Sequence, residues 1–481
     1  MGSEDRSLSI LFFPFMAQGH MLPMLDMAKL FALYGVKSTV VTTPANVPIV
    51  NSVIDQPDVS TLHPIQLRLI PFPSDTGLPE GCENVSSIPP RDMPTVHVTF
   101  FSATAKLREP FGKVLEDLRP DCIVTDMFFP WTYDVAAELG IPRIVFHGTN
   151  FFSLCVTDSL ERYKPVENLR SDAESVVIPG LPHRIEVLRS QIPEYEKSKA
   201  DFVREVRESE SKSYGAVVNS FFELEPDYAR HYREVVGRRA WHIGPLALVN
   251  NSTTDKSSRG YKTAIDRNDC LKWLDSKRLR SVVYVCFGSM SDFSDAQLRE
   301  MASGLEASNH PFIWVVRKSG KEWLPEGFEE RVQERGLIIR GWAPQILILN
   351  HRAVGGFMTH CGWNSSLEAV SAGLPLVTWP LFAEQFYNER FMVDVLRIGV
   401  SVGAKRHGMK AEEREVVEAK MVKEAVDGLM DDGEEAEGRR RRARELGEKA
   451  RKAVEKGGSS YEDMRNLLQE LKGDSKLTVG C

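Results

Sequence analysis

The sequence predicts an α/β protein built from two doubly wound halves. Short apolar runs alternate with helix-length amphipathic patterns along most of its 481 residues. A polar stretch between Leu248 and Asp266 interrupts this alternation, and a second series of apolar runs and helical patterns follows it. Alternation of this kind is typical of βαβ units in a mostly parallel sheet. Two such halves of similar size would place a ligand in the cleft between them.

The first half begins with a continuous apolar run at Ser9–Phe15, as expected of a strand buried on both faces. Gly19 ends this run. Apolar residues then recur at helical spacing over His20–Tyr34, and Gly35 is suited to end the helix. Further strands are expected at Val36–Thr43, Ile65–Ile70, Cys122–Thr125, Arg143–Phe146, Ala216–Asn219 and Trp241–Ile243. The Pro-, Gly- and Ser-rich stretch Pro71–Pro90 predicts a long loop.

The second half repeats the pattern. Its strands are expected at Ser281–Phe287, Phe312–Val316, Leu337–Arg340, Gly355–Thr359 and Pro375–Thr378. We therefore expect an N-terminal domain at 1–247, a linker at 248–266, a C-terminal domain at 267–460, and a C-terminal helix and tail at 461–481 that can pack back on the N-terminal domain. The arginine run inside Glu434–Lys452 is flanked by glutamates, which favours a solvated, salt-bridged helix over a nucleic-acid patch.

Composition narrows the function classes. Lys and Arg total 60 against 67 Asp and Glu, a net charge of −7, which disfavours a nucleic-acid or anionic-membrane binder. The seven cysteines are scattered without a CxxC pair, so a zinc site or disulfide framework is not expected and a reducing compartment is. The chain shows neither a signal-peptide pattern nor an apolar run of membrane-spanning length. We expect a cytoplasmic monomer with no integral membrane association and no nucleic-acid partner.

Two side chains at expected strand ends in the first half can carry chemistry. His20 follows the first strand and a glycine turn, and its ordinary pKa near ~6.5 suits a general base. Asp126 follows the strand Cys122–Thr125 and could orient such a histidine and stabilise its protonated form. Taken alone, His20 is equally well explained as a residue that merely begins a helix. For Asp126 taken alone, simple capping of the following helix is the favoured explanation.

The second half carries a denser polar constellation at Thr359–Glu368, where a strand runs through a glycine turn into a helix. Free backbone N–H groups and the helix dipole make such a start an anion site suited to a pyrophosphate. His360 adds a hydrogen-bond donor, and Glu368 could accept two ribose hydroxyls. Ordinary capping by Asn364 or Ser365 would explain the turn, but not why His, Asn, Ser and Glu gather there.

Several familiar catalytic motifs are absent from the sequence. No GxGxxG follows an expected strand, and no Gly-x4-Gly-Lys-Ser/Thr occurs, so dinucleotide oxidation and P-loop hydrolysis lose their usual support. Neither an HExxH motif nor a serine nucleophile elbow is present.

The 44 residues Trp342–Gln385 resemble the signature box of plant secondary-product UDP-glycosyltransferases over its whole length. That motif is long and highly specific. Other segments resemble the same family nearly throughout the chain. Within the family, their resemblance is strongest to the branch that acts on phenolics, flavonoids, triterpenes and steroidal sapogenins. They are PFMAQGHMLPMLDMAKL, IVTDMFFPW, FHGTNFF, VVNSFFELEPDYA, HIGPL, CLKWLDSK and VVYVCFGSM.

The resemblance implies the two-domain GT-B fold, with two Rossmann-like domains facing across a cleft. It implies that the N-terminal half takes the acceptor near Gly19 and His20, and that the C-terminal half takes a UDP-sugar. Trp342 would stack on uracil, and Ala343 and Gln345 would hydrogen-bond to the edge of uracil or to the ribose. Glu368 would bind the ribose hydroxyls. The remaining implied donor contacts are His360, Asn364, Ser365 and Ser289 to the diphosphate, and Trp363, Glu384 and Gln385 to the sugar.

The resemblance also implies an inverting reaction. His20 would remove the acceptor proton, Asp126 would balance the imidazolium, and the product would be a β-glucoside. Gln385 is the residue found at this position in family members that use UDP-glucose, whereas a histidine there would suggest UDP-galactose. At position 363 the chain has a tryptophan in place of the arginine that is linked to use of UDP-glucuronate. UDP-glucose is then a co-substrate, with no metal or other cofactor, and the acceptor is a small lipophilic molecule with a hydroxyl group.

Two other function classes share this architecture. A non-catalytic sugar-nucleotide or small-molecule binding protein is disfavoured by the intact His20 and Asp126, and measuring UDP release with and without acceptor would decide. A lipid-linked sugar transferase at a membrane surface is disfavoured by the acidic net charge and the lack of a basic amphipathic helix. A transferase that uses another UDP-sugar stays open. Acceptor identity depends on the loops at Pro71–Met93 and Thr149–Lys199.

Overall fold

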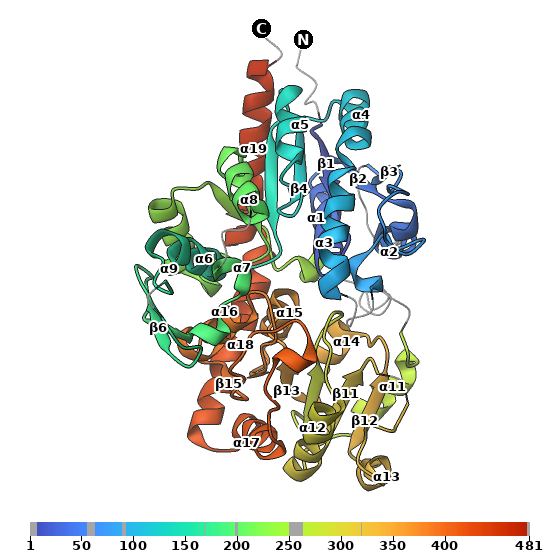
Figure 1. The fold of residues 1–481 in the computed structure, drawn as a ribbon, viewed down its shortest axis with the longest axis vertical. Coiled ribbons are helices and arrows are strands. Elements are labelled where there is room, and N and C mark those ends of the chain that lie inside the picture. The colour runs from blue at the N-terminus through green and yellow to red at the C-terminus, as the bar shows by residue number, and fades with distance from the viewer. Residues whose placement is uncertain are drawn as a thin grey trace.

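The computed structural model describes residues 7–54, 63–88, 93–167, 169–197, 201–249, 263–318 and 320–478. Two parallel sheets form two lobes, one above the other in Figure 1. The N-terminal sheet has seven strands: β1 (Ser9–Phe13), β2 (Lys37–Thr42), β3 (Gln66–Leu69), β4 (Cys122–Asp126), β5 (Arg143–His147), β8 (Gly215–Val218) and β9 (Ala240–His242).

The order of these strands is β3-β2-β1-β4-β5-β8-β9. Strands β2 and β3 are therefore added on one side of β1, and the strands from β4 onward are added on its other side. Phe13 of β1 lies opposite Thr125 of β4, which brings the carboxyl ends of these two central strands side by side. Ligands of open α/β sheets bind at such a switch point, outside the carboxyl ends of the strands. This topology therefore places His20 and Asp126 at the expected ligand site.

Helices cover both faces of the N-terminal sheet (Figure 1). They are α1 (Gln18–Leu33), α2 (Val47–Ile54), α3 (Met93–Ala105), α4 (Arg108–Leu118), α5 (Thr132–Glu138), α6 (Phe151–Tyr163), α7 (Glu194–Lys197), α8 (Asp201–Lys212) and α9 (Pro226–His231). A separate antiparallel hairpin pairs β6 (Ser175–Ile178) with β7 (Ile185–Leu188).

The C-terminal sheet repeats this design with six strands in the order β12-β11-β10-β13-β14-β15. Its strands are β10 (Val282–Cys286), β11 (Phe312–Val316), β12 (Gly336–Arg340), β13 (Val354–Thr359), β14 (Leu376–Thr378) and β15 (Gly399–Ser401). The switch point lies between β10 and β13, where Cys286 is opposite Thr359. The turns that follow these two strands carry Ser289 and His360.

The helices of the second half are α11 (Arg267–Asp275), α12 (Asp295–Ser308), α13 (Phe328–Val332), α14 (Gln345–Leu349), α15 (Trp363–Ala372), α16 (Gln385–Arg390), α17 (Ala419–Met430), α18 (Glu434–Val454) and α19 (Ser459–Thr478). The last of them leaves the lower lobe and runs beside the N-terminal sheet, so both chain ends lie at the top of Figure 1. Met464, Leu467 and Leu471 of α19 are buried in one apolar cluster with strands of that sheet.

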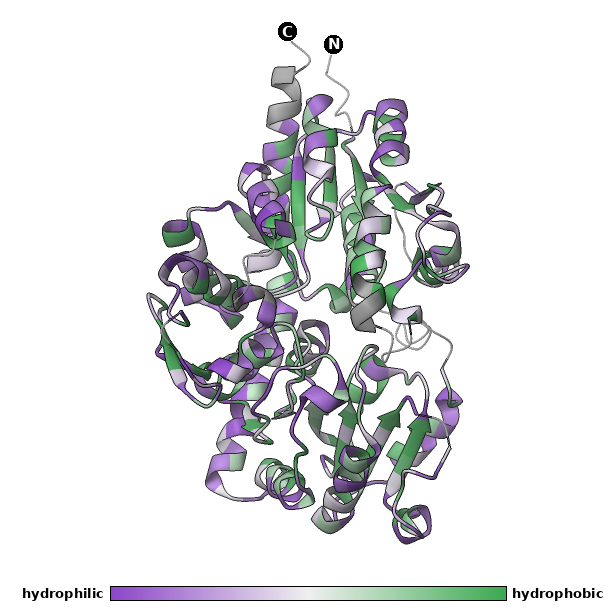
Figure 2. Cartoon of the chain, in the orientation of Figure 1, coloured by the Kyte–Doolittle hydropathy of each residue, from purple (hydrophilic) through white to green (hydrophobic). Residues whose placement is uncertain are grey.

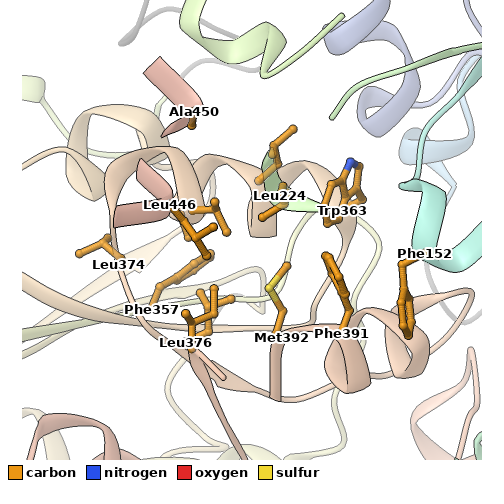
Figure 3. Packing of buried hydrophobic residues seen from close by; sticks show 14 of the residues in the cluster. Phe152, Leu224, Phe357, Trp363, Leu374, Leu376, Phe391, Met392, Leu446 and Ala450 are labelled. Atoms are coloured by element: carbon orange, nitrogen blue, oxygen red, sulfur yellow. The ribbon is translucent and has the colours of Figure 1, made fainter. Parts of the chain in front are cut away.

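Apolar residues concentrate in the strands, while the helices are purple on their outer faces (Figure 2). One buried cluster continues from the first half into the second, and part of it is drawn in Figure 3. Phe152 of α6 stacks on Phe391, which follows α16, with ring centroids 4.9 Å apart. The two halves therefore share a packed apolar core on one side of the molecule, and their relative orientation is supported by close packing.

The strand predictions are confirmed at every expected position, with each end displaced by two residues or fewer. The first helix begins at Gln18 rather than His20. The hairpin β6–β7 and the three-residue strand β15 were not predicted. Residues 250–262 of the predicted linker, 89–90 of the predicted loop and 479–481 of the predicted tail lie outside the described residues.

Candidate functional site

His20 and Asp126 meet at the carboxyl end of the N-terminal sheet. His20 lies in the first turn of α1 and Asp126 is the last residue of β4. The Nδ1 atom of His20 is 2.7 Å from Oδ2 of Asp126. The carboxylate is fully buried, and its second oxygen accepts the backbone N–H of Phe128 at 3.1 Å. Asp126 therefore holds one ring nitrogen of His20 and leaves Nε2 as the free one.

The surroundings of this pair favour the protonated form of His20. Burial lowers its pKa, but the charge of Asp126, the hydrogen bond to Asp126 and the charge of Glu384 outweigh burial, so the pKa is raised above 6.5. Behind the pair, buried Arg143 donates to the carbonyl of Asp126 at 3.3 Å and to Oγ1 of Thr125 at 2.7 Å. The strand end that carries Asp126 is thereby fixed.

Aromatic rings surround His20 on the side of the N-terminal domain. The imidazole centroid lies 5.6 Å from the ring of Phe15 and 5.2 Å from that of Phe128. Phe101 stacks on Phe15 at 5.3 Å, and Phe202 of α8 lies 4.8 Å from Phe101. Phe101, Phe128 and Phe202 are only partly buried. The imidazole of His20 thus borders an apolar, ring-rich surface.

In the C-terminal half, the imidazole of His360 lies between two glycines. A Cβ atom at Gly288 would come within 2.7 Å of His360 Nε2, and one at Gly362 within 2.4 Å. The ring therefore fits only because neither position has a side chain. Burial, followed by the charge of Arg317, lowers the pKa of His360 to about 4. At neutral pH this histidine is an uncharged imidazole.

The turn after β13 leads directly into α15. Cys361 has a left-handed backbone with φ 64°, Gly362 precedes the helix, and Trp363 begins it. The predicted helix start near Asn364 is thus one residue late. Ser289, half-buried, follows Gly288 at the end of the neighbouring strand. The structure therefore gathers the four residues expected to meet a diphosphate at the switch point of the C-terminal sheet.

Gln345 connects residues expected to meet the nucleoside. Its Nε2 atom donates to Oε2 of Glu368 at 2.8 Å and to Oγ of Ser365 at 3.0 Å. Trp342 is half-buried, and the guanidinium carbon of Arg317 lies 5.7 Å from its ring centroid. Ala343 is buried beside it. Ser365 and Glu368 lie on α15, Gln345 begins α14, and Trp342 and Ala343 lie in the segment that joins β12 to α14.

Gln385 and Glu384 stand at the start of α16. The side-chain oxygen of Gln385 accepts the backbone N–H groups of Leu381 and Phe382 at 2.9 and 3.0 Å, so its amide nitrogen is the group left to donate. Asn388, one turn on, donates to Glu384 at 3.3 Å and to the carbonyl of Cys361 at 2.9 Å. Burial raises the pKa of Glu384.

Trp363, the third expected sugar contact, has a buried side chain. Its side chain is 2% exposed, and its indole N–H donates to the carbonyl of Asn219 at 2.7 Å. In Figure 3 the ring lies within the shared apolar cluster, near Phe391. The indole N–H is therefore already used in joining the two halves, and the side chain packs between them.

A short hydrogen bond joins the first turn of α15 to the first turn of α1. The Nδ2 atom of Asn364, on α15, donates to the carbonyl oxygen of Gly19 at 2.6 Å. Gly19 immediately precedes His20 in α1. The first turn of the helix expected to hold the diphosphate is thus in direct contact with the turn that carries the candidate base.

Sequence reasoning missed several residues of this site. Asn388 also accepts hydrogen bonds from Asn150 and Ser153 of the N-terminal half, at 2.9 and 3.0 Å. Its position four residues after Glu384 on a helix was the available signal. Thr149 has a buried hydroxyl without a hydrogen-bond partner within the described ranges. The aromatic residues around His20 had no signal, because they come from four separate segments.

No group of three or more His, Cys, Asp or Glu side chains in the described ranges is arranged to hold a metal ion. Within those same ranges, no helix is both long and apolar enough to cross a membrane.

Comparison with known families matches this chain to two models. The model described as "UDP-glucoronosyl and UDP-glucosyl transferase" matches residues 201–430, and the model "Glycosyltransferase, N-terminal domain" matches residues 6–248. Scopoletin glucosyltransferase of Nicotiana tabacum is 52% identical over 96% of this chain and 98% of its own length. UDP-glucose flavonoid 3-O-glucosyltransferase 7 of Fragaria ananassa is 50% identical over 98% of each chain.

A solved structure agrees with these relatives. Glycyrrhiza uralensis UGT73P12, crystallised with glycyrrhetinic acid 3-O-monoglucuronide, is 41% identical and superposes with a TM-score of 0.91 over 98% of this chain and 97% of that one. Structures of Arabidopsis thaliana UGT89C1 with UDP, UDP-L-rhamnose or quercetin have TM-scores of 0.74 to 0.75 at 31 to 32% identity. The expected GT-B fold is confirmed, and the chain belongs to the family of UDP-glucosyl and UDP-glucuronosyl transferases, as a UDP-glycosyltransferase closely related to plant enzymes.

Proposed function

We propose that this enzyme transfers glucose from UDP-glucose, with inversion, to a hydroxyl group of a small lipophilic acceptor. The observation that carries the proposal is the His20–Asp126 pair, which meets the C-terminal half at the Asn364–Gly19 contact. A base on one side of the cleft and a nucleotide-sized polar patch on the other form the arrangement that an in-line displacement requires.

His20 is the proposed general base. Because Asp126 holds Nδ1, Nε2 takes the proton of the acceptor hydroxyl while its oxygen attacks the anomeric carbon. The bond between that carbon and the diphosphate oxygen breaks, UDP leaves with the electron pair, and the α-linked sugar becomes a β-glucoside. Buried Asp126 stabilises the imidazolium formed, and such base catalysis is worth ~10²–10⁴-fold.

UDP leaves with added negative charge, and the proposed stabilisation comes from donors of the C-terminal half. His360, neutral at physiological pH, offers an N–H group, and Asn364 and Ser365 stand in the first turn of α15. The helix dipole adds to their effect. Since this set consists of donors rather than carboxylates, we propose that the reaction needs no divalent cation. Unchanged activity in excess chelator is the expected result.

Glucose is the proposed sugar. The free amide N–H₂ of Gln385 suits a sugar hydroxyl, and the neighbouring Glu384 can accept from another. No cation stands at residue 363, where Trp363 is buried, to pair with the carboxylate of a glucuronate. The relatives from Nicotiana tabacum and Fragaria ananassa are both named as glucosyltransferases.

The acceptor is proposed to be a phenolic, flavonoid or triterpenoid hydroxyl compound. The partly exposed rings of Phe101, Phe128 and Phe202 beside His20 provide an apolar surface for flat or bulky lipophilic molecules. Relatives are named for scopoletin and for a flavonoid, and UGT73P12 was crystallised with a triterpenoid glucuronide. Within this class the aromatic surface favours planar phenols.

The test is an acceptor screen with UDP-glucose, read by mass spectrometry, on the wild-type enzyme and the His20→Ala variant. The proposal expects glucoside formation from at least one lipophilic phenol or alcohol, lost in the variant while UDP-glucose still binds. Donor binding without product from any acceptor would instead mark a binding protein.

We further propose that the enzyme acts as a monomer in the cytoplasm. The six described cysteines are all unpaired, which agrees with a reducing compartment. Light scattering after size exclusion, and imaging of a tagged protein, test these two points separately.

A further inference from the structure

The hydrogen bond between Asn364 and Gly19 joins residues 345 positions apart in the sequence. Its Nδ2···O distance of 2.6 Å is short for an N–H···O bond. Because the acceptor is a main-chain carbonyl, only the amide nitrogen of Asn364 can face it, so the orientation of this side chain is settled. The other amide atom, Oδ1, is buried and has no hydrogen-bond partner in the described part of the chain.

Both ends of this bond are held firmly. On the acceptor side, Gly19 lies in the first turn of α1, and the carbonyl of Ala17 accepts the backbone N–H groups of His20 and Met21 at 2.9 and 2.8 Å. On the donor side, Asn364 lies in the first turn of α15, where the Ser366 N–H is bonded to the carbonyl of Gly362 at 3.0 Å. A shift of α15 is therefore transmitted to the turn that carries His20.

We propose that Asn364 is a positioning residue for His20, and not only a ligand of the diphosphate. Its amide ties the base-bearing turn to the helix that cradles the donor, and so sets the distance between His20 Nε2 and the acceptor oxygen. A misplacement of about 1 Å can cost on the order of a hundredfold in rate. This inference rests on the proposed function, because it assigns His20 as the base.

The contact with the carbonyl of Gly19 also explains why residue 364 is an asparagine. An aspartate would have nearly the same shape but would present an oxygen to the carbonyl of Gly19, so it would repel where asparagine attracts. Ser365, the next residue, provides a matched control. Its hydroxyl accepts a hydrogen bond from Gln345, and both residues belong to the C-terminal half.

The experiment compares two acceptors: a weakly acidic phenol, which needs a base, and an electron-poor thiophenol, ionised at the assay pH, which does not. Wild type, Asn364→Ala, Asn364→Asp, Ser365→Ala and His20→Ala are measured with both, and UDP affinity is measured by calorimetry. With the thiophenol, both Asn364 variants should lose only what the missing diphosphate contact costs. With the phenol, we expect them to lose a further ten- to a hundredfold in kcat, and so to shift the ratio of the two rates in the same direction as His20→Ala. Ser365→Ala should lower both rates alike through weaker donor binding.

The outcomes test the positioning role of Asn364 separately from the role of His20 as the base. If the Asn364 variants slow both acceptors equally, or neither, while His20→Ala slows only the phenol, the positioning role is wrong and the proposed base stands. If His20→Ala transfers to the phenol at the wild-type rate, the proposed mechanism itself is wrong. Thermal melts identify any misfolded variant, and the near-isosteric Asn364→Asp then carries the comparison.

Discussion

Nε2 of Gln345 donates to Oε2 of Glu368 at 2.8 Å, and this hydrogen bond orients the carboxylate. Glu368 lies in the second turn of α15, on the same helix as the residues expected to meet the diphosphate. A carboxylate fixed in this way is prepared for two neighbouring ribose hydroxyls before the nucleotide arrives, which lowers the entropy cost of binding.

Glu368→Ala should weaken UDP binding by about ten- to a hundredfold, since hydrogen bonds to a charged group are worth ~1.5–3 kcal/mol. His20→Ala should leave UDP affinity almost unchanged, because His20 belongs to the other half of the site. Calorimetric titration with UDP measures the affinity of both variants, and the surface variant Glu424→Ala is the control. Equal losses in Glu368→Ala and His20→Ala would contradict the division into donor and acceptor halves.

The pH dependence of kcat should show an acid limb set by His20. Burial alone would lower the pKa of His20, but Asp126 and Glu384 raise it above 6.5. Only the neutral form accepts a proton, so the rate should fall as the pH drops through this raised value. Asp126→Asn should move the limb to lower pH and also reduce the plateau by ~10²–10⁴-fold, through loss of imidazolium stabilisation. A pH–rate profile identical to wild type would show that Asp126 has no such role.

Donor choice should favour glucose. Wild type should prefer UDP-glucose over UDP-galactose and UDP-glucuronate by about three- to tenfold or more in kcat/KM, the effect of one hydrogen bond of ~0.5–1.5 kcal/mol. Gln385→Glu keeps an oxygen for the N–H groups of Leu381 and Phe382 but loses the amide donor. It should therefore reduce the preference without disturbing the turn. Competition among the three donors at equal concentration measures this, and a dominant galactoside or glucuronide from the wild-type enzyme would refute it.

Gly362→Ala should displace His360 and weaken donor binding. The added Cβ would lie 2.4 Å from His360 Nε2, closer than any real contact, so the imidazole must move. Gly428→Ala is the matched control, because the nearest atom to its Cβ is 4.0 Å away and alanine is favoured in a helix by about 1 kcal/mol. We expect UDP affinity to drop at least tenfold in the first variant only. An unchanged UDP affinity in Gly362→Ala would mean that His360 does not contact the nucleotide.

Leu467→Ala in α19 should destabilise the N-terminal lobe. The side chain is fully buried in the apolar cluster that includes Ile10 and Phe12 of β1, and removing it costs about 2–5 kcal/mol. Leu279→Ala serves as the control, since that leucine is 66% exposed. Denaturant unfolding followed by tryptophan fluorescence measures the difference. Equal stability of the two variants would mean that α19 contributes little to this core.

Much of the site was predictable because parallel strands end at one edge of a sheet. The apolar runs located β1, β4, β10 and β13, and the polar residues after them followed. That His20 contacts Asp126 depends on β1 and β4 being neighbours, which no local pattern reveals. The contact of Asn364 with Gly19 and the burial of Trp363 against Asn219 depend on how the two halves pack together. Such contacts arise from tertiary packing between distant segments, and sequence periodicity carries no information about them.

The position of α19 has a consequence for how the protein is made. The N-terminal sheet is synthesised first, but Met464, Leu467 and Leu471, which fill one side of its core, leave the ribosome only after the whole C-terminal sheet. Until then the apolar surface that α19 covers stays open on an otherwise formed lobe. The final fold of the first domain therefore waits for the synthesis of α19, and a polypeptide truncated before Ser459 would expose that surface to chaperones or to aggregation.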